Sequence, residues 1–174
     1  MTRFTLCLAA AATALTFASH AFAGEQYLDG TGFAVSGYDV VAYFDLPQNP
    51  VGVTQPAAVP GNASITAEFN GATFAFSTQA NRDKFLANPA QYAPQYDGHC
   101  AYGVAQGGKV PGNPELWRIV DNKLYLNITP VVESFWEENI PRNLSLSEKN
   151  WVSLEPAAGS NRPIPQFTSK APFK

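Results

Sequence analysis

The chain has 174 residues, a formal net charge of −3 and an aromatic content of 13%. Because no window carries the basic stripe that attracts phosphates, the sequence argues against nucleic acid as a partner. Residues 24–174, which remain after removal of a predicted export signal, are enough for one domain with a single packed core.

Residues 1–23 have the order of a secretory signal peptide. Arg3 supplies a positive charge, residues 4–17 are mostly apolar, and Ala21-Phe22-Ala23 is a small-x-small cleavage site. We therefore expect the mature protein to begin at Gly24 and to be periplasmic or secreted. Because the apolar stretch is short for a membrane anchor, we expect no membrane span after cleavage.

The next clear signal is a β-hairpin within residues 65–77. Apolar-alternating segments flank Asn70-Gly71, a residue pair that favours a two-residue turn with φ above zero at both positions. A helix should follow, with Ser77 or Thr78 as its N-cap and its end near Ala87, just before an Asn-Pro pair.

The second half of the chain predicts another hairpin and several short helices. Residues 99–105 are compact and rich in small residues, which indicates a short helix or a tight loop. Residues 117–127 predict strands around Asp121-Asn122, a weaker turn pair because glycine is missing. Residues 130–139 have the apolar spacing of an amphipathic helix, and Pro141 suits the first turn of another.

Two segments lack regular periodicity. Residues 47–60 are rich in proline, glycine and small residues, and we expect them to form a loop over the core. Residues 155–174 contain four prolines, which predicts an extended or flexible tail. The expected fold is therefore α+β, with two short β-hairpins packed against several short helices in a single domain of residues 24–154.

Signal cleavage leaves one cysteine and one histidine, and they are neighbours, Cys100 and His99. A thiolate beside an imidazole suits copper or zinc. A stable zinc site normally needs four ligands, so a cuprous ion, which tolerates fewer, is the better prediction. By motif, Asp39 and Asp97 are the nearest further ligands, and a protein partner could supply others. The predicted metal ligands are Cys100, His99, Asp39 and Asp97.

Other interpretations of these residues stay open. Free cysteines are among the most buried residue types and are often inert, so Cys100 can be a core residue of an interaction module. A lone thiol in an oxidising compartment can instead be redox-active, with His99 lowering its pKa. Asp39, which follows Gly-Tyr, can cap the next helix by accepting hydrogen bonds from free amide groups.

Conventional enzyme mechanisms are disfavoured. Adjacent residues usually point in different directions, which places His99 poorly to deprotonate Cys100. The sequence contains no Gly-x-Ser-x-Gly elbow, and Gly107-Gly108 lacks the lysine and serine context of a phosphate-binding loop.

Four blocks of sequence carry a resemblance to a known family. In chain order they are residues 37–44 (GYDVVAYF), 69–77 (FNGATFAFS), 85–92 (FLANPAQY) and 94–101 (PQYDGHCA). Blocks of this kind in this order resemble exported bacterial YHS-domain proteins, and the resemblance spans residues 37–151. It implies a YHS-like domain within residues 24–154.

The resemblance also implies a connection with metals. YHS domains occur attached to copper-transporting ATPases and near metal-handling systems, and many carry cysteines after the first hairpin. The corresponding stretch here, residues 76–79, has no thiol, so a two-cysteine site does not carry over. We therefore expect a non-catalytic periplasmic protein that binds or handles copper through Cys100. The alternatives are an interaction module with a buried, inert cysteine and a thiol redox protein.

Overall fold

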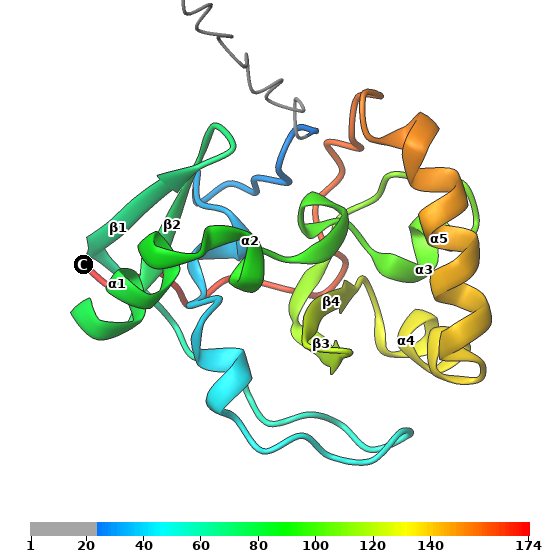
Figure 1. Ribbon diagram of the computed structural model, residues 1–174, viewed down its shortest axis with the longest axis horizontal. Coiled ribbons are helices and arrows are strands. Elements are labelled where there is room, and N and C mark those ends of the chain that lie inside the picture. The colour runs from blue at the N-terminus through cyan, green and yellow to red at the C-terminus, as the bar shows by residue number, and fades with distance from the viewer. Residues whose placement is uncertain (1–23) are drawn as a thin grey trace, which may run out of the picture.

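The computed structural model describes residues 24–174, and the predicted signal peptide of residues 1–23 lies outside them. The described chain has the predicted α+β fold, in which two antiparallel two-stranded sheets pack with short helices (Figure 1). The strands are β1 (Asn62–Phe69), β2 (Ala72–Phe76), β3 (Asn113–Val120) and β4 (Lys123–Asn127). The α-helices are α1 (Gln79–Ala87), α2 (Pro89–Tyr92), α3 (Ala101–Ala105), α4 (Pro130–Glu137) and α5 (Ile140–Leu154). Three 3₁₀ helices are η1 (Val35–Gly37), η2 (Ala42–Asp45) and η3 (Gln95–Gly98).

Both predicted hairpin turns are confirmed. Asn70 and Gly71 have φ of 48° and 74°, and they connect β1 to β2. Asp121 and Asn122 have φ of 49° and 60°, and they connect β3 to β4. Aspartate and asparagine tolerate the left-handed region because their short polar side chains bond locally, so the second turn forms without a glycine.

Side-chain caps and prolines mark the helix starts, and the predicted N-cap Thr78 is confirmed. The Thr78 hydroxyl accepts a hydrogen bond from the backbone N–H of Asn81 at 3.1 Å, at the N-terminus of α1. The Thr129 hydroxyl accepts one from Val132 at 3.3 Å, and Pro130 opens α4. A proline also occupies the first turn of α5, as predicted. Each cap satisfies one of the amide groups that a helix start leaves without a partner.

The β3–β4 hairpin lies between the first hairpin and helices α3 to α5 (Figure 1), and its residues belong to both clusters of the hydrophobic core. Trp117, Leu124 and Leu126 belong to the cluster that contains the first hairpin and α1. Tyr125 faces the other way and packs with Trp136 in the cluster of α3, α4 and α5. Because successive strand residues point to opposite faces, β4 contributes to both clusters and joins them into one body. Within residues 24–174, no helix is both long and apolar enough to cross a bilayer.

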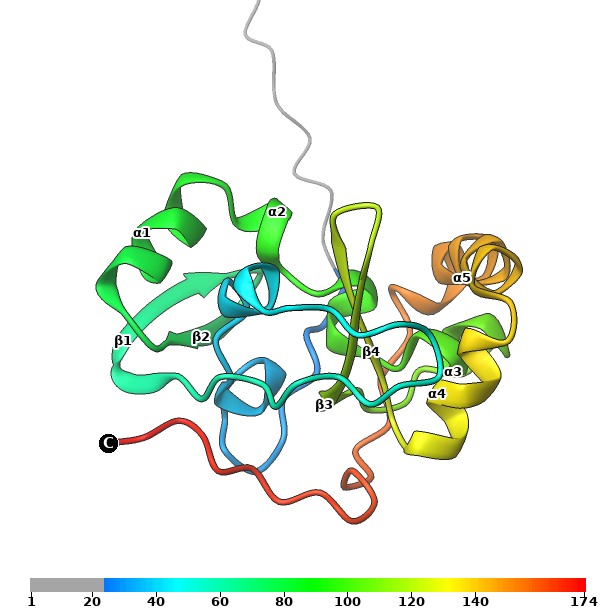
Figure 2. The same ribbon diagram turned by 90° about the horizontal axis from the view of Figure 1, so that it is seen from below.

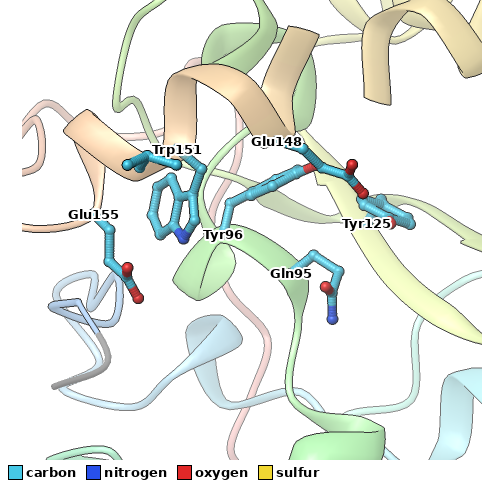
Figure 3. A pocket seen from close by; sticks show the side chains of 7 residues that line it. Gln95, Tyr96, Tyr125, Glu148, Trp151 and Glu155 are labelled. Atoms are coloured by element: carbon cyan, nitrogen blue, oxygen red, sulfur yellow. The ribbon is translucent and has the colours of Figure 1, made fainter. Parts of the chain in front are cut away.

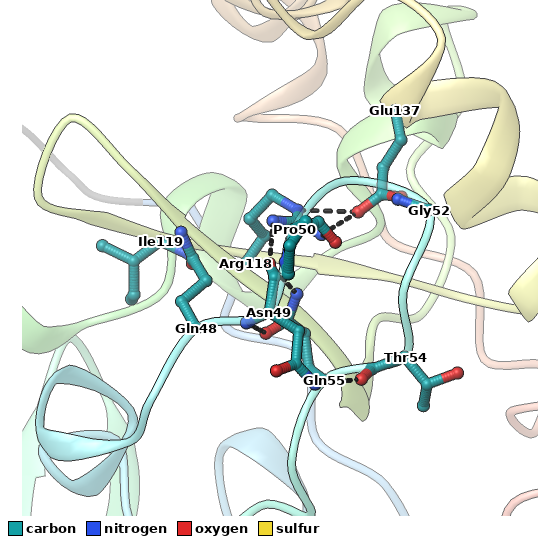
Figure 4. A network of polar contacts seen from close by, with 9 residues as sticks. All are labelled: Gln48, Asn49, Pro50, Gly52, Thr54, Gln55, Arg118, Ile119 and Glu137. Carbon is teal, nitrogen blue, oxygen red and sulfur yellow. Dashed lines mark hydrogen bonds and ion pairs between the residues drawn. The ribbon is translucent and has the colours of Figure 1, made fainter.

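Residues 47–60 form the predicted loop over the core, and a buried arginine holds it in place (Figure 4). Arg118 on β3 donates hydrogen bonds to the carbonyl oxygens of Asn49 and Pro50, at 3.1 and 3.3 Å. Its Nε also donates to Glu137 Oε1 on α4 at 2.6 Å. The side chains of Arg118 and Glu137 are only 5% and 7% exposed. One guanidinium group therefore ties the loop to β3 and α4.

Residues 155–174 run as an extended segment back across the domain to β1 (Figure 2). The Ser169 hydroxyl donates a hydrogen bond to the carbonyl oxygen of Ser36 at 2.6 Å. Phe173 exchanges backbone hydrogen bonds with Gly61 and Ala63, at 2.9 and 2.6 Å. These contacts place the extended segment against the first half of the chain, while its predicted flexibility stays a prediction.

Candidate functional site

Cys100 is sealed inside the domain. It is the N-cap residue of α3, and its exposed fraction is 0%. The sequence allowed either a short helix or a tight loop at this place, and the segment forms a helix. The sulfur accepts a hydrogen bond from the backbone N–H of Gly103 at 3.3 Å and donates toward Asn127 Oδ1 at 3.6 Å. Burial raises the pKa of the thiol to about 11, although backbone N–H groups nearby oppose the shift. These are the surroundings of a structural cysteine.

We expect Cys100 to resist alkylation in the folded protein. With a thiol pKa of about 11, only about one thiol in ten thousand is ionised at pH 7, and the thiolate is the nucleophile. Iodoacetamide at pH 7 should leave the native protein unmodified and should label it fully after unfolding in urea, as read by intact mass. Rapid labelling of the native protein would contradict this expectation and favour a redox role.

His99 faces a different part of the structure from its neighbour. Its Nδ1–H donates to the carbonyl oxygen of Tyr96 at 3.0 Å, and its ring lies 5.9 Å from the Tyr27 ring. A Cβ placed on Gly159 would lie 2.7 Å from Nε2, so this nitrogen points at the chain that follows α5. The residue is 1% exposed, and burial lowers the pKa of its imidazole to about 4. The imidazole and the Cys100 thiol therefore contact different elements and do not converge.

Asp39 acts as a cap, one of the two roles left open by the sequence. Its Oδ1 accepts hydrogen bonds from the backbone N–H groups of Val41 and Ala42, at 3.0 and 3.3 Å, beside η2. Its Oδ2 accepts from the Ser77 N–H and hydroxyl, at 2.8 and 2.6 Å, and from the Asn81 side chain at 2.7 Å. Five donors therefore occupy this buried carboxylate and fix η2 against the start of α1.

Asp97 is the predicted ligand with an incomplete set of contacts. It lies in η3 with φ of 52°, and its Oδ1 accepts a hydrogen bond from Gln26 Nε2 at 2.6 Å. Its Oδ2 is buried and has no hydrogen-bond partner among residues 24–174. Burial raises the pKa of this carboxyl to about 6, and the charge of Lys109 opposes that shift.

The four predicted ligands do not form a copper site as arranged. Cys100 contacts Asn127 on β4, His99 contacts the end of α5, and Asp39 caps η2 with no free oxygen. Across residues 24–174, no group of three or more His, Cys, Asp or Glu side chains is placed to hold a metal. Copper binding stays a prediction, but this donor set does not fit it.

An open pocket of about 330 Å³ lies against one face of α5 near its C-terminal end (Figure 3). Glu148, Trp151, Val152 and Glu155 contribute from successive turns of the helix end, and residues of η3 and β4 complete the lining. The lining residues are Gln95, Tyr96, Tyr125, Glu148, Trp151, Val152 and Glu155. The positions on α5 have the i, i+3, i+4, i+7 spacing of one helix face, which is the sequence signal that could have found them.

No known protein identifies the chain. No family model matches the sequence, and neither a curated protein nor a solved structure matches it. The resemblance to exported YHS-domain proteins therefore stays a prediction, and the chemistry of the pocket has to be argued from its own residues.

Aromatic rings and carboxylates meet in this pocket. The Tyr96 ring centroid lies 5.8 Å from that of Tyr125 and 5.4 Å from that of Trp151. Glu148 and Glu155 stand at its edges, and neither forms an ion pair within the described part of the chain (Figure 3). Electron-rich ring faces beside carboxylates suit an organic cation, since both attract positive charge.

Tyr96, one of the rings that line the pocket, is uncharged at neutral pH. Burial raises the pKa of Tyr96 to about 12, so its hydroxyl stays protonated at neutral pH.

The ammonium of Lys109 already lies 5.2 Å from the Trp151 ring centroid, and it donates to the carbonyl oxygens of Glu155 and Ala157 at 3.0 Å each. This contact shows that the indole is compatible with a neighbouring cation.

Proposed function

We propose that this protein is an exported, non-catalytic interaction module that binds a cationic group, an ammonium or guanidinium, in the pocket of Figure 3. The observation that carries the proposal is a contrast in accessibility. The predicted reactive residues, Cys100 and His99, are 0% and 1% exposed, whereas the aromatic pocket is open and has carboxylates at its edges. Export is supported by the signal-like order of residues 1–23.

A structural role for Cys100 follows from the same contacts. Its sulfur accepts a hydrogen bond from the Gly103 N–H and caps α3, the helix that packs against α5. The Ser147 hydroxyl on α5 donates to the carbonyl oxygen of Ala101 at 3.0 Å, which fixes the same packing from the other side. Cys100 therefore stabilises the packing of α3 against the pocket-lining helix α5 and does not itself line the pocket.

Binding should be modest in strength. A cation over an exposed aromatic face gains about 0.5–1 kcal/mol, rising to about 2 where water is excluded. An exposed carboxylate adds up to about 1 kcal/mol, which corresponds to about a fivefold change in affinity. A single small cation should therefore bind at millimolar level, as expected for one contact within a larger interface.

Choline and its uncharged carbon isostere, 3,3-dimethyl-1-butanol, separate charge recognition from apolar contact. We expect choline to shift the Trp151 indole resonance in NMR titrations, with an affinity several times that of the isostere. Glu148→Gln should weaken choline binding by about fivefold, since it removes one carboxylate from the edge. Glu138→Gln, an exposed change at the end of α4, is the matched control and should leave binding unchanged.

Two results would overturn the proposal. The first is equal binding of choline and its isostere, or an equal effect of the two substitutions, because the pocket would then not discriminate charge. The second is stoichiometric copper in protein purified from its native compartment that is lost in Cys100→Ser, because that result would restore metal handling as the function.

A further inference from the structure

Two buried acceptor atoms near the start of the described chain have no donor. Oδ2 of Asp97 and Oε1 of Gln26 are both buried without a hydrogen-bond partner among residues 24–174. The two side chains already contact each other through Gln26 Nε2 and Asp97 Oδ1. A buried polar atom without a partner is unfavourable, so this cluster lacks a hydrogen-bond donor.

Gly24 lies against this cluster. A Cβ built on Gly24 would lie 2.5 Å from Asp97 Oδ2, 2.6 Å from the carbonyl oxygen of Glu155 and 2.9 Å from its Cγ. The α-nitrogen is about 2.5 Å from any Cβ on the same α-carbon, so it lies within about 5 Å of Oδ2. Only glycine brings the backbone this close to a carboxylate, since any side chain would collide with it.

The position of Gly24 is fixed by its neighbours in the chain. Gln26 donates to the Asp97 side chain at 2.6 Å, and the backbone N–H of Tyr27 donates to the Asp97 carbonyl oxygen at 2.8 Å. Glu155, just after α5, lies beside Gly24, because its carbonyl oxygen and Cγ would be within 3 Å of a Gly24 Cβ. The segment is therefore attached to η3 on one side and covered by the end of α5 on the other.

We propose that removal of the signal peptide supplies the missing donor, because the new α-ammonium group of Gly24 pairs with Asp97 Oδ2. A signal peptidase hydrolyses the Ala23–Gly24 peptide bond with one water molecule. The water oxygen becomes part of the new Ala23 carboxylate, and both hydrogens of the water join the one already on the Gly24 nitrogen, which becomes an ammonium group. The uncharged amide of the precursor is thereby replaced by a cation with three donors.

The carboxylates of Asp97 and Glu155 favour this pairing, and the ammonium group of Lys109 opposes it. Burial and the Glu155 carboxylate raise the pKa of Asp97, whereas Lys109 and the Gln26 side chain lower it. An ammonium group beside Oδ2 would stabilise the carboxylate, and the carboxylate would raise the pKa of the α-amino group above its usual value of about 8. The mature N-terminus is then part of the folded structure. The inference rests on cleavage after Ala23 and is independent of the ligand of the pocket.

The test uses the full chain, exported and processed in a bacterial host. Intact mass identifies the first residue, and peptide mapping follows acetylation of the Gly24 α-amino group by an N-hydroxysuccinimide ester at pH 7. Each unit by which the α-amino pKa rises lowers the reactive neutral amine about tenfold. We therefore expect acetylation at least about tenfold slower in the processed protein than in Asp97→Asn. Glu25→Gln, at the exposed neighbouring residue, should retain the protection.

Gly24→Ala tests the ion pair without removing the Asp97 carboxylate. The variant also keeps a small residue after the cleavage site, so processing is preserved. Its Cβ would collide with Oδ2, so we expect the α-amino group to be displaced and acetylated as fast as in Asp97→Asn. Equal acetylation rates in the processed wild type and Asp97→Asn would overturn the inference. A mature protein that begins at a residue other than Gly24 would overturn it too.

Discussion

Arg118→Met should lower the free energy of unfolding by about 3–5 kcal/mol, which is the usual effect of removing one partner of a buried ion pair. The substitution keeps the apolar stem but leaves the Glu137 carboxylate, 7% exposed, without its cation. It also removes the donors to the carbonyl oxygens of Asn49 and Pro50, so the loop loses two of its hydrogen bonds to β3 (Figure 4). Urea unfolding followed by tryptophan fluorescence measures the change.

A matched change at an exposed ion pair controls for loss of arginine itself. Arg82 and Asp83 form a pair at 3.1 Å with side chains 33% and 65% exposed, so Arg82→Met should change stability by no more than about 1 kcal/mol. The double variant Arg118→Met with Glu137→Gln should recover part of the loss, because no unpaired charge is then buried. Arg118→Met with no greater effect than Arg82→Met would show that the loop is held by other contacts.

Local structure was predictable because its causes are local. The Asn70-Gly71 and Asp121-Asn122 pairs place both turns, and Thr78 starts α1 where the sequence predicts. Asn70 and Gly71 adopt positive φ for reasons that lie within the two residues themselves. The α+β fold follows from these elements, because two hairpins and several short amphipathic helices can bury their apolar faces only against one another.

The surroundings of the candidate site were not predictable, because they depend on residues far apart in the sequence. Cys100 contacts Asn127, 27 residues away, and Asp97 contacts Gln26, 71 residues away. The Arg118–Glu137 pair likewise needs two elements packed together. The identity of a residue indicates which chemistry it could perform, whereas its pKa and exposure are set by tertiary packing.

The pocket was missed for a related reason. Tyr96 is only 8% exposed, which is the burial of a core residue, yet it lines an open pocket together with Trp151. A buried aromatic residue and a pocket-lining one have the same sequence pattern when the pocket lies over the core. The acidic residues Glu148 and Glu155 distinguish this pocket from a closed core, because they place charged side chains on the same side of the helix as Trp151.

His99 should make the protein less stable in acid, by about 3 kcal/mol between pH 6.5 and pH 4. Burial lowers the pKa of the folded imidazole from 6.5 to about 4, and the charge of Lys109 acts in the same direction. Above pH 6.5 the imidazole is neutral in both states, so its contribution to stability is fully present. As the pH falls, the unfolded chain takes up the proton first, and stability falls by about 1.4 kcal/mol per unit until the folded imidazole also protonates near pH 4.

The comparison that isolates this effect is His99→Asn, whose side-chain amide can donate to Tyr96 in place of Nδ1 and does not titrate. Without the Gly24 ammonium group, Asp97 has a carboxyl pKa raised to about 6 and acts in the opposite direction, since its contribution is present below pH 3.8 and is lost as the pH rises through 6. Both proteins contain Asp97, so the difference between their unfolding free energies reports His99 alone. That difference should change by about 3 kcal/mol from pH 7 to pH 4 in favour of the variant. A difference that is constant across this range would mean that the folded imidazole titrates near 6.5 and is reached by water.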